Sequence, residues 1–198
     1  MVTRANLDRA TVIAAARDLL DDDGLAGFSM ARLGERLGVT AMALYRHIRD
    51  RAELESAVVE LVLDDLTVED SSKQAVAFWM RSVRAHWLEH PWLGSLLGTS
   101  TSLNRSWIAA LEHLAASLER AGLSDEQVAQ QVVQISRVTC GILIQEIAVP
   151  LPQRGDLGAA LTRHAPTLRR YGNDALFEDL VDETEARIKR LARRRAAA

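Results

Sequence analysis

The sequence predicts an all-α protein, with an N-terminal three-helix domain and a larger helical core, about nine to ten helices in total. Apolar residues recur at spacings of three and four through most of the chain, and Gly or Pro residues separate these segments. No segment alternates apolar and polar residues as a half-buried strand does. The 198 residues are 48% hydrophobic and 26% charged, which is typical of a folded protein and not of a disordered one.

The clearest local pattern lies between Phe28 and Arg51, where two short helices and a tight turn are expected. Ser29 suits an N-cap, because its hydroxyl can accept a hydrogen bond from the first helical turn. Gly38 suits the end of that helix, since glycine adopts the left-handed conformation at no steric cost. Thr40 then caps a second helix, expected over residues 41–48. Two helices joined by a Gly-containing turn, the second with an aromatic and basic outer face, are typical of a helix-turn-helix.

This N-terminal segment resembles the DNA-binding domain of the tetracycline-repressor (TetR) family. The run Leu44-Tyr45-Arg46-His47 is the most specific part of the match. The resemblance implies a transcriptional regulator that is not an enzyme, and more finely a repressor released from a palindromic operator by a small effector. The other matching residues are Val12 to Ala16, Leu19, Leu20, Gly24, Phe28, Ser29, Leu33, Leu37 to Val39 and Leu54.

The resemblance also implies which side chains meet the DNA. Tyr45 and His47 match the family and would bind phosphates, while Arg46 would bind a guanine or a phosphate. Ala41 and Met42 replace polar residues of the tetracycline repressor and offer only apolar contact, for instance with a thymine methyl group. From the residues alone, Tyr45 could instead be a packing aromatic and Arg46 a solvated charge. The full set expected to contact double-stranded operator DNA is Ser29, Arg32, Thr40, Ala41, Met42, Tyr45, Arg46, His47 and Arg51.

The charge distribution limits how the protein can bind DNA. The formal net charge is −3, so the chain is not a general polycation. From Phe28 to Arg51 there are five arginines against Glu35 and Asp50, a local balance of +3, and DNA binding must depend on this patch. The run Asp21-Asp22-Asp23 precedes the patch, and its simplest interpretation is a solvated corner.

Composition and cap patterns indicate the domain boundaries. The polar run Thr67–Ser72 marks the main one. The resemblance is weaker after this run, and it implies a dimer interface from the two longest late helices, here Ser124–Val149 and Asn173–Arg195. Both helices also carry more apolar surface than one protomer can cover, which supports a homodimer. The expected division is a helix-turn-helix domain at 1–50, a connecting helix at 51–66, and an effector-binding and dimerisation domain at 67–198.

The second half holds most of the large aromatic side chains, and the resemblance implies that it binds a small effector. Leu96 stands where the tetracycline repressor has a metal-binding histidine, and Gln145 replaces a distal glutamate. This difference favours a larger, mainly apolar or aromatic effector and no metal or other cofactor, because ligand pockets are mostly apolar. The alternative for each tryptophan is plain core packing. The residues expected near the effector are Trp79, His86, Trp87, Trp107, His113, Gln145 and Glu146.

One rival pattern indicates a different class of protein. His86-Trp87-Leu88-Glu89-His90 matches H-x-x-E-H, the inverted zinc-protease signature, in which two histidines bind zinc and the glutamate activates water. The pattern is short, and Pro91 loosens the helical placement of the second histidine. A zinc-dependent enzyme is therefore the alternative to a regulator.

The single cysteine, Cys140, excludes an intramolecular disulfide and fits a reducing cytosol. Buried packing is favoured for its thiol over a role as a redox sensor. No apolar run reaches the ~18 residues of a membrane span, and the N-terminus lacks the apolar core of a signal peptide. The sequence thus predicts a soluble, cytoplasmic protein without membrane contact.

Overall fold

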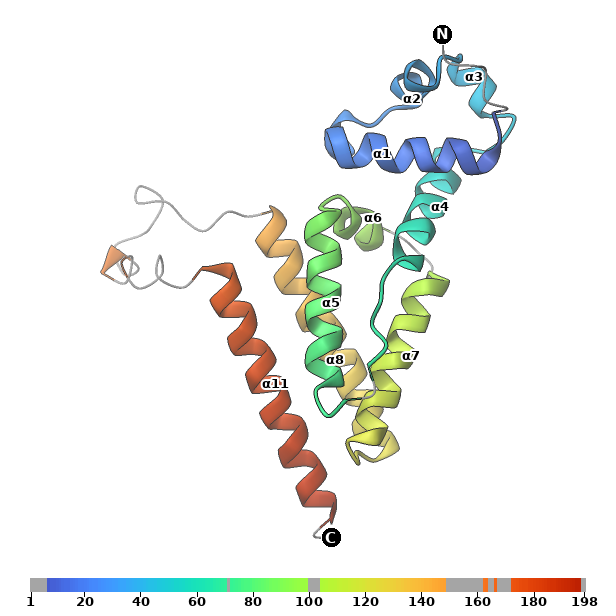
Figure 1. Ribbon diagram of the computed structural model, residues 1–198. Coiled ribbons are helices and arrows are strands. Elements are labelled where there is room, and N and C mark those ends of the chain that lie inside the picture. Colours follow the sequence, from blue (N-terminus) through green and yellow to red (C-terminus); the bar gives the residue numbers. More distant parts are fainter. Residues whose placement is uncertain are drawn as a thin grey trace. The chain divides into compact units, whose positions relative to one another are not determined.

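The computed structural model describes residues 7–70, 72–99, 104–148, 162–163, 166 and 172–196. Within these ranges the chain forms helices and no strand, which confirms the all-α prediction (Figure 1). No helix in the described ranges is long and apolar enough to cross a membrane. The helices are α1 (Arg9–Gly27), α2 (Met30–Leu37), α3 (Ala41–Leu44), α4 (Arg51–Asp64), α5 (Ala75–Glu89), α6 (Leu93–Thr99), α7 (Arg105–Arg120), α8 (Asp125–Ala148) and α11 (Asn173–Ala196).

The chain divides into two compact units that do not follow a single cut in the sequence. The first unit combines residues 1–66 with residues 89–109, and the second combines 67–88 with 110–198. The first change of unit falls at the polar run after Leu66, where the sequence indicates a boundary. The segment 89–109, by contrast, groups with the N-terminal residues and not with the rest of the second half.

In the first unit, α1 packs against both α2 and α4, and α6 packs against α4. Asp8 caps α1, because its carboxylate accepts a hydrogen bond from the backbone N–H of Thr11 at 2.8 Å. Gly24 kinks this helix near its end with φ 66° and ψ 179°, a conformation that glycine adopts readily. The side chains buried in this unit include Val12, Ala16, Leu20, Leu33, Leu44, Leu54, Val58 and Leu93.

The predicted cap residues of the helix-turn-helix occupy their expected positions. The hydroxyls of Ser29 and Thr40 accept from backbone N–H groups three residues further on, at 3.2 and 3.3 Å. Gly38 ends α2 in the left-handed conformation, with φ 67° and ψ 29°. Gly34 is needed for a second reason: a Cβ there would lie only 2.8 Å from the carbonyl oxygen of Val39. The turn can therefore pass close over α2.

The second helix of the motif is shorter than the sequence predicts. It spans Ala41–Leu44 and ends before Ile48. The backbone N–H groups of Arg46 and His47 bond carbonyls only three residues back, at 3.3 and 2.9 Å, so the chain tightens into 3₁₀-type turns. The side chains of Leu44 and Ile48 are nevertheless both buried, 0% and 2% exposed. Periodicity thus predicted the buried face but not the helix end.

In the second unit α8 contacts α11, and side-chain contacts join α5 to α7, to α8 and to α11. Trp79 is fully buried, and its indole N–H donates to the carbonyl oxygen of Ala110 at 2.7 Å. Arg84 on α5 forms an ion pair with Glu146 on α8 at 2.6 Å and lies over the ring of Phe177 on α11, 4.9 Å from its centroid. Other buried side chains of this unit are Met80, Val83, Leu114, Leu118, Ile135, Leu143 and Val181.

Candidate nucleic-acid interface

The outer face of α3 and the turn after it is exposed, because Leu44 and Ile48 fix the opposite face in the core. Met42 is 74% exposed and Tyr45 is 43% exposed, which is unusual for large apolar side chains unless a partner covers them. Arg46 is exposed beside them. An apolar, aromatic and basic face on the second helix of a helix-turn-helix is a surface suited to the major groove of DNA.

The five arginines between Phe28 and Arg51 are not equivalent. Four form ion pairs with carboxylates, which reduces their contribution to a positive patch. Arg46 is the exception, since it makes no ion pair within the described part of the chain. The four pairs are Arg32–Asp23, Arg36–Asp22, Arg49–Asp50 and Arg51–Glu55, with N–O distances of 2.7, 2.8, 2.9 and 2.6 Å.

Arg32, one of the expected DNA contacts, is directed toward the end of α1. Besides its ion pair with Asp23, its guanidinium donates to the carbonyl oxygen of Gly27 at 2.8 Å. Gly27 leaves room for this contact, because a Cβ there would lie 2.9 Å from the guanidinium. Arg51 and Glu55 are four residues apart on α4, the spacing at which helical side chains of opposite charge meet. No local spacing connected Arg32 or Arg36 with α1, so sequence reasoning missed these pairs.

Other residues of the expected set also have contacts inside the protein. The hydroxyls of Ser29 and Thr40 serve as helix caps. The guanidinium of Arg51 lies 5.2 Å from the ring centroid of Phe28. His47 and Ala41 are half-buried next to the exposed face of α3. Of the expected residues, Met42, Tyr45 and Arg46 are therefore the most available to a partner.

The residues expected near an effector differ in burial and in the unit to which they belong. Trp79 and Trp87 are buried in the second unit, whereas Trp107 belongs to the first. Glu146 is occupied by Arg84, and both side chains are largely buried, at 9% and 15% exposed. Gln145 is exposed, and His86 is half-buried on α5. Exposed His113 lines a polar hollow of about 370 Å³ together with Glu69, Asp70 and Arg120.

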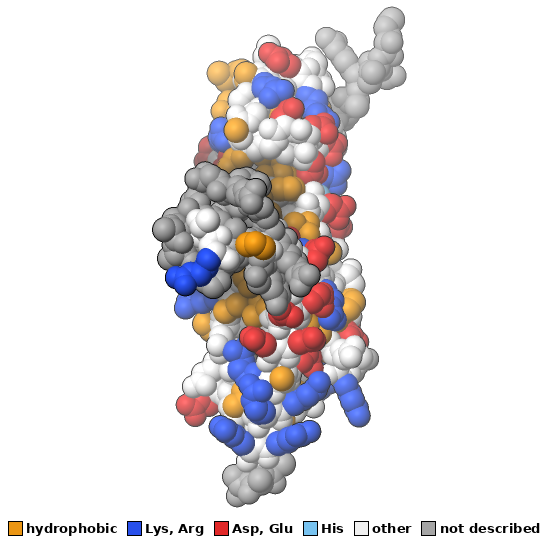
Figure 2. Space-filling view, turned by 90° about the vertical axis from the view of Figure 1, so that its left-hand side faces the viewer, with side chains coloured by type: hydrophobic (Ala, Val, Ile, Leu, Met, Phe, Trp, Pro, Cys, Tyr) orange, Lys and Arg blue, Asp and Glu red, His pale blue; other side chains and the backbone are white. Residues whose placement is uncertain are grey.

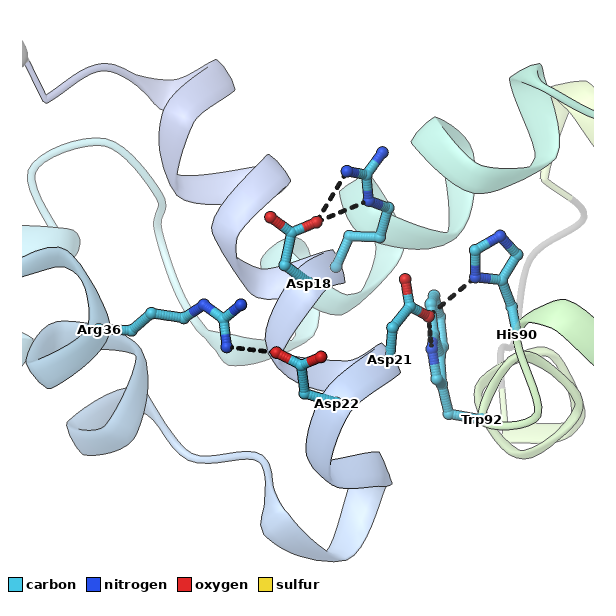
Figure 3. A network of polar contacts seen from close by, with 7 residues as sticks. Asp18, Asp21, Asp22, Arg36, His90 and Trp92 are labelled. Atoms are coloured by element: carbon cyan, nitrogen blue, oxygen red, sulfur yellow. Dashed lines mark hydrogen bonds and ion pairs between the residues drawn. The ribbon is translucent and has the colours of Figure 1, made fainter.

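The H-x-x-E-H segment lies where α5 ends, and its last histidine has a structural role. The Nδ1 atom of His90 lies 2.8 Å from the carboxylate of Asp21 on α1. The indole N–H of Trp92 donates to the same oxygen at 2.7 Å (Figure 3). One ring nitrogen of His90 is thus engaged by Asp21, while possible ligand atoms of His86, Glu89 and His90 lie within 4.8 Å of one another.

Burial determines the chemistry of the one cysteine. Cys140 is largely enclosed on α8, and desolvation raises the pKa of its thiol to about 12. A thiol with such a pKa carries almost no thiolate near neutral pH. Packing, as the sequence favoured, fits this residue better than redox sensing.

A helix-turn-helix with an exposed second helix, in a chain that also has a second compact helical unit, defines a class: the helix-turn-helix transcriptional regulators. Residues 12–58 match the profile of the bacterial regulatory proteins of the tetR family. Residues 68–188 match that of the tetracyclin repressor-like C-terminal domain. The chain belongs to the TetR family of transcriptional regulators.

Individual relatives agree with this assignment. An HTH-type transcriptional regulator of Saccharopolyspora erythraea is 26% identical over 82% of this chain and 70% of its own length. The HTH-type transcriptional repressor DrrR1 of Streptomyces coeruleorubidus is 27% identical over 68% of this chain and 51% of its own length, so the chain spans about half of that repressor.

Solved structures share the fold. A possible TetR family regulator from Streptomyces coelicolor has a TM-score of 0.80 at 24% identity, covering 93% of this chain and all of that one. ActR from Streptomyces coelicolor, in complex with (S)-DNPA, has a TM-score of 0.74 at 23% identity, covering 95% of this chain and all of that one.

Proposed function

We propose that this protein is a repressor that binds a palindromic operator as a homodimer and is released by a small, mainly apolar or aromatic effector. The observation that carries the DNA-binding part is the exposed face of α3, where Met42, Tyr45 and Arg46 stand outward over buried Leu44 and Ile48. The name of DrrR1, a repressor, supports the direction of regulation.

Within this proposal the residues have different roles. Arg46 reads a guanine or binds a phosphate, because its guanidinium is exposed and unpaired in the described chain. The Tyr45 hydroxyl binds a phosphate, and Met42 contacts a thymine methyl group. Arg51 lies over the ring of Phe28 and Arg32 pairs with Asp23, so both stabilise the fold around the site. They contact DNA only if a phosphate replaces these partners.

The homodimer rests on uncovered apolar surface and on charge. On α8, the side chains of Val133, Val138 and Ile144 are 48%, 38% and 41% exposed. The first half of α11 is mainly acidic and its last turns are basic, ending in Arg193 to Arg195. In the lower part of Figure 2, which views the side of the molecule that carries α11, acidic side chains (red) lie above basic ones (blue). Two copies of α11 arranged antiparallel about a two-fold axis would place each acidic half against a basic half.

The effector proposal rests on the aromatic content of α5 and α7 and on Leu96, which is 8% exposed and offers no metal ligand. Titration of tryptophan fluorescence with hydrophobic drugs or metabolites in the absence of magnesium tests it. Quenching together with loss of operator binding is the expected result, and a strict requirement for magnesium would exclude the proposed effector class.

The direct test of DNA binding is fluorescence anisotropy with a duplex from the region upstream of the protein's own gene, measured across a salt series. Neutralised phosphates release counterions, so the association constant should fall steeply as salt rises. Tyr45→Phe should weaken binding to different sequences by the same factor, because a phosphate contact carries no base information. Salt-insensitive binding, or none, would refute the proposal.

A further inference from the structure

The run Asp21-Asp22-Asp23 is more than a solvated corner. It forms the last turn of α1 before the kink at Gly24. Carboxylates at this end of a helix are disfavoured by its dipole, so a run of three calls for compensating partners. All three carboxylates have such partners within the first unit.

The three carboxylates contact two different parts of the first unit. Asp22 and Asp23 pair with Arg36 and Arg32, both on α2 of the helix-turn-helix. Asp21 accepts from the ring nitrogen of His90 and from the indole N–H of Trp92, as Figure 3 shows. Side chains of successive helical residues point about 100° apart. Three consecutive aspartates on one turn can therefore contact partners on different sides of the helix.

The corner that Asp21 holds is well ordered by packing. Trp92 is 4% exposed, and its ring lies edge-to-face with that of His90, with centroids 5.9 Å apart. The corner leads directly into α6, which packs against α4. One carboxylate oxygen thus accepts two buried or half-buried donors, an arrangement with little freedom to shift without losing a hydrogen bond.

We propose that Asp21 is a positioning residue that couples the His90-Pro91-Trp92 corner to the helix-turn-helix through the end of α1. A movement of α2 is carried by the Arg36–Asp22 and Arg32–Asp23 pairs to the last turn of α1, and from there by Asp21 to the corner. The reverse path passes a displacement of the corner to α2, since coupling between two sites is reciprocal. This connection runs through side-chain contacts, and it is separate from the chain connection that α4 provides. The proposal rests on the proposed DNA binding.

Labelling with 5-fluorotryptophan and ¹⁹F NMR can test this coupling, because the chain has four tryptophans and Trp92→Phe assigns the resonance of interest. The probe is the duplex from the region upstream of the protein's own gene. In the wild type, adding the duplex should shift the Trp92 resonance. Asp21→Asn, which keeps an oxygen acceptor, should retain the shift, and Asp21→Ala, which removes it, should abolish the shift while DNA remains bound.

Asp18→Ala is the matched control, because Asp18 lies on the same helix and, among the described residues, its carboxylate accepts only from its neighbour Arg17. It should leave the Trp92 response unchanged. If Asp21→Ala does not unfold cooperatively, Asp21→Leu, which also lacks an acceptor, takes its place. Full retention of the shift in the variant that lacks the acceptor, or an unmoved Trp92 resonance in DNA-bound wild type, would overturn the coupling. Absence of DNA binding in the anisotropy assay would overturn the proposed function itself and the coupling with it.

Discussion

The helix-turn-helix and the second unit are both built from amphipathic helices, yet they are held together differently. In the helix-turn-helix, caps and turns bond neighbours three or four residues away, as at Ser29, Gly38 and Thr40. In the second unit the decisive contacts join distant parts of the chain, such as Trp79 with Ala110 and Arg84 with Glu146. Local rules therefore suffice to place an exposed binding face in the first region, but not to place a ligand site in the second.

The largest expected effect distinguishes a core aromatic from an exposed side chain of α3. Trp79→Ala should destabilise the protein by about 3–5 kcal/mol, because it leaves a cavity and removes the hydrogen bond to the Ala110 carbonyl. Met42→Ala, at an exposed position, should change stability by no more than about 0.5 kcal/mol. Chemical denaturation of both variants provides the measurement. Similar losses in the two would show that α3 is packed as part of a core.

A second experiment compares two apolar residues of nearly equal exposure. Ile144 on α8 is 41% exposed and Ile108 on α7 is 39% exposed. Ile144→Glu should weaken the dimer by about 2–5 kcal/mol, since it places an unpaired charge in the proposed interface. Ile108→Glu should leave the dimer intact. Analytical ultracentrifugation at micromolar concentration measures the oligomeric state of both variants and of the wild type. A wild type that is monomeric at this concentration would contradict the assignment of the interface.

The smallest expected effect concerns the cap at the start of α4. The backbone N–H of Glu53 donates to Asp50, and this bond, with help from Arg49, holds the pKa of Asp50 below its usual range. A lowered folded-state pKa contributes stability above the unfolded pKa of about 4, and this contribution is lost as the pH falls through the folded value. Asp50→Asn should reduce the loss of unfolding free energy that the wild type shows as the pH falls through the acid range. Asp179→Asn, at an exposed position on α11, serves as the control and should leave that loss unchanged.

Most of the fold could be predicted from the sequence because its determinants are local. The caps at Ser29 and Thr40 formed as predicted, and Ser124 and Gln127, three residues apart, form the reciprocal bonds of a capping box. The end of α3 could not be predicted, since a switch from four- to three-residue hydrogen bonds leaves the apolar spacing unchanged.

The candidate site was predictable only where exposure follows from periodicity. Leu44 and Ile48 are apolar and face the core, so Met42, Tyr45 and Arg46 on the opposite face are exposed. The pairing of Arg32 with Asp23 depends on how α1 and α2 cross, and the grouping of residues 89–109 with the N-terminal residues depends on tertiary packing. Neither leaves a pattern in the sequence.

The central claim is that the DNA-binding surface depends on one unpaired arginine and not on the summed charge of the segment. The most direct test compares Arg46→Ala with Arg36→Ala, because both remove one guanidinium from the same motif, but Arg36 is paired with Asp22. Arg46→Ala should cost about 1–3 kcal/mol of operator affinity and relax preference at one base position. Arg36→Ala should leave the affinity and its salt dependence close to those of the wild type. Equal losses in the two variants would contradict the account.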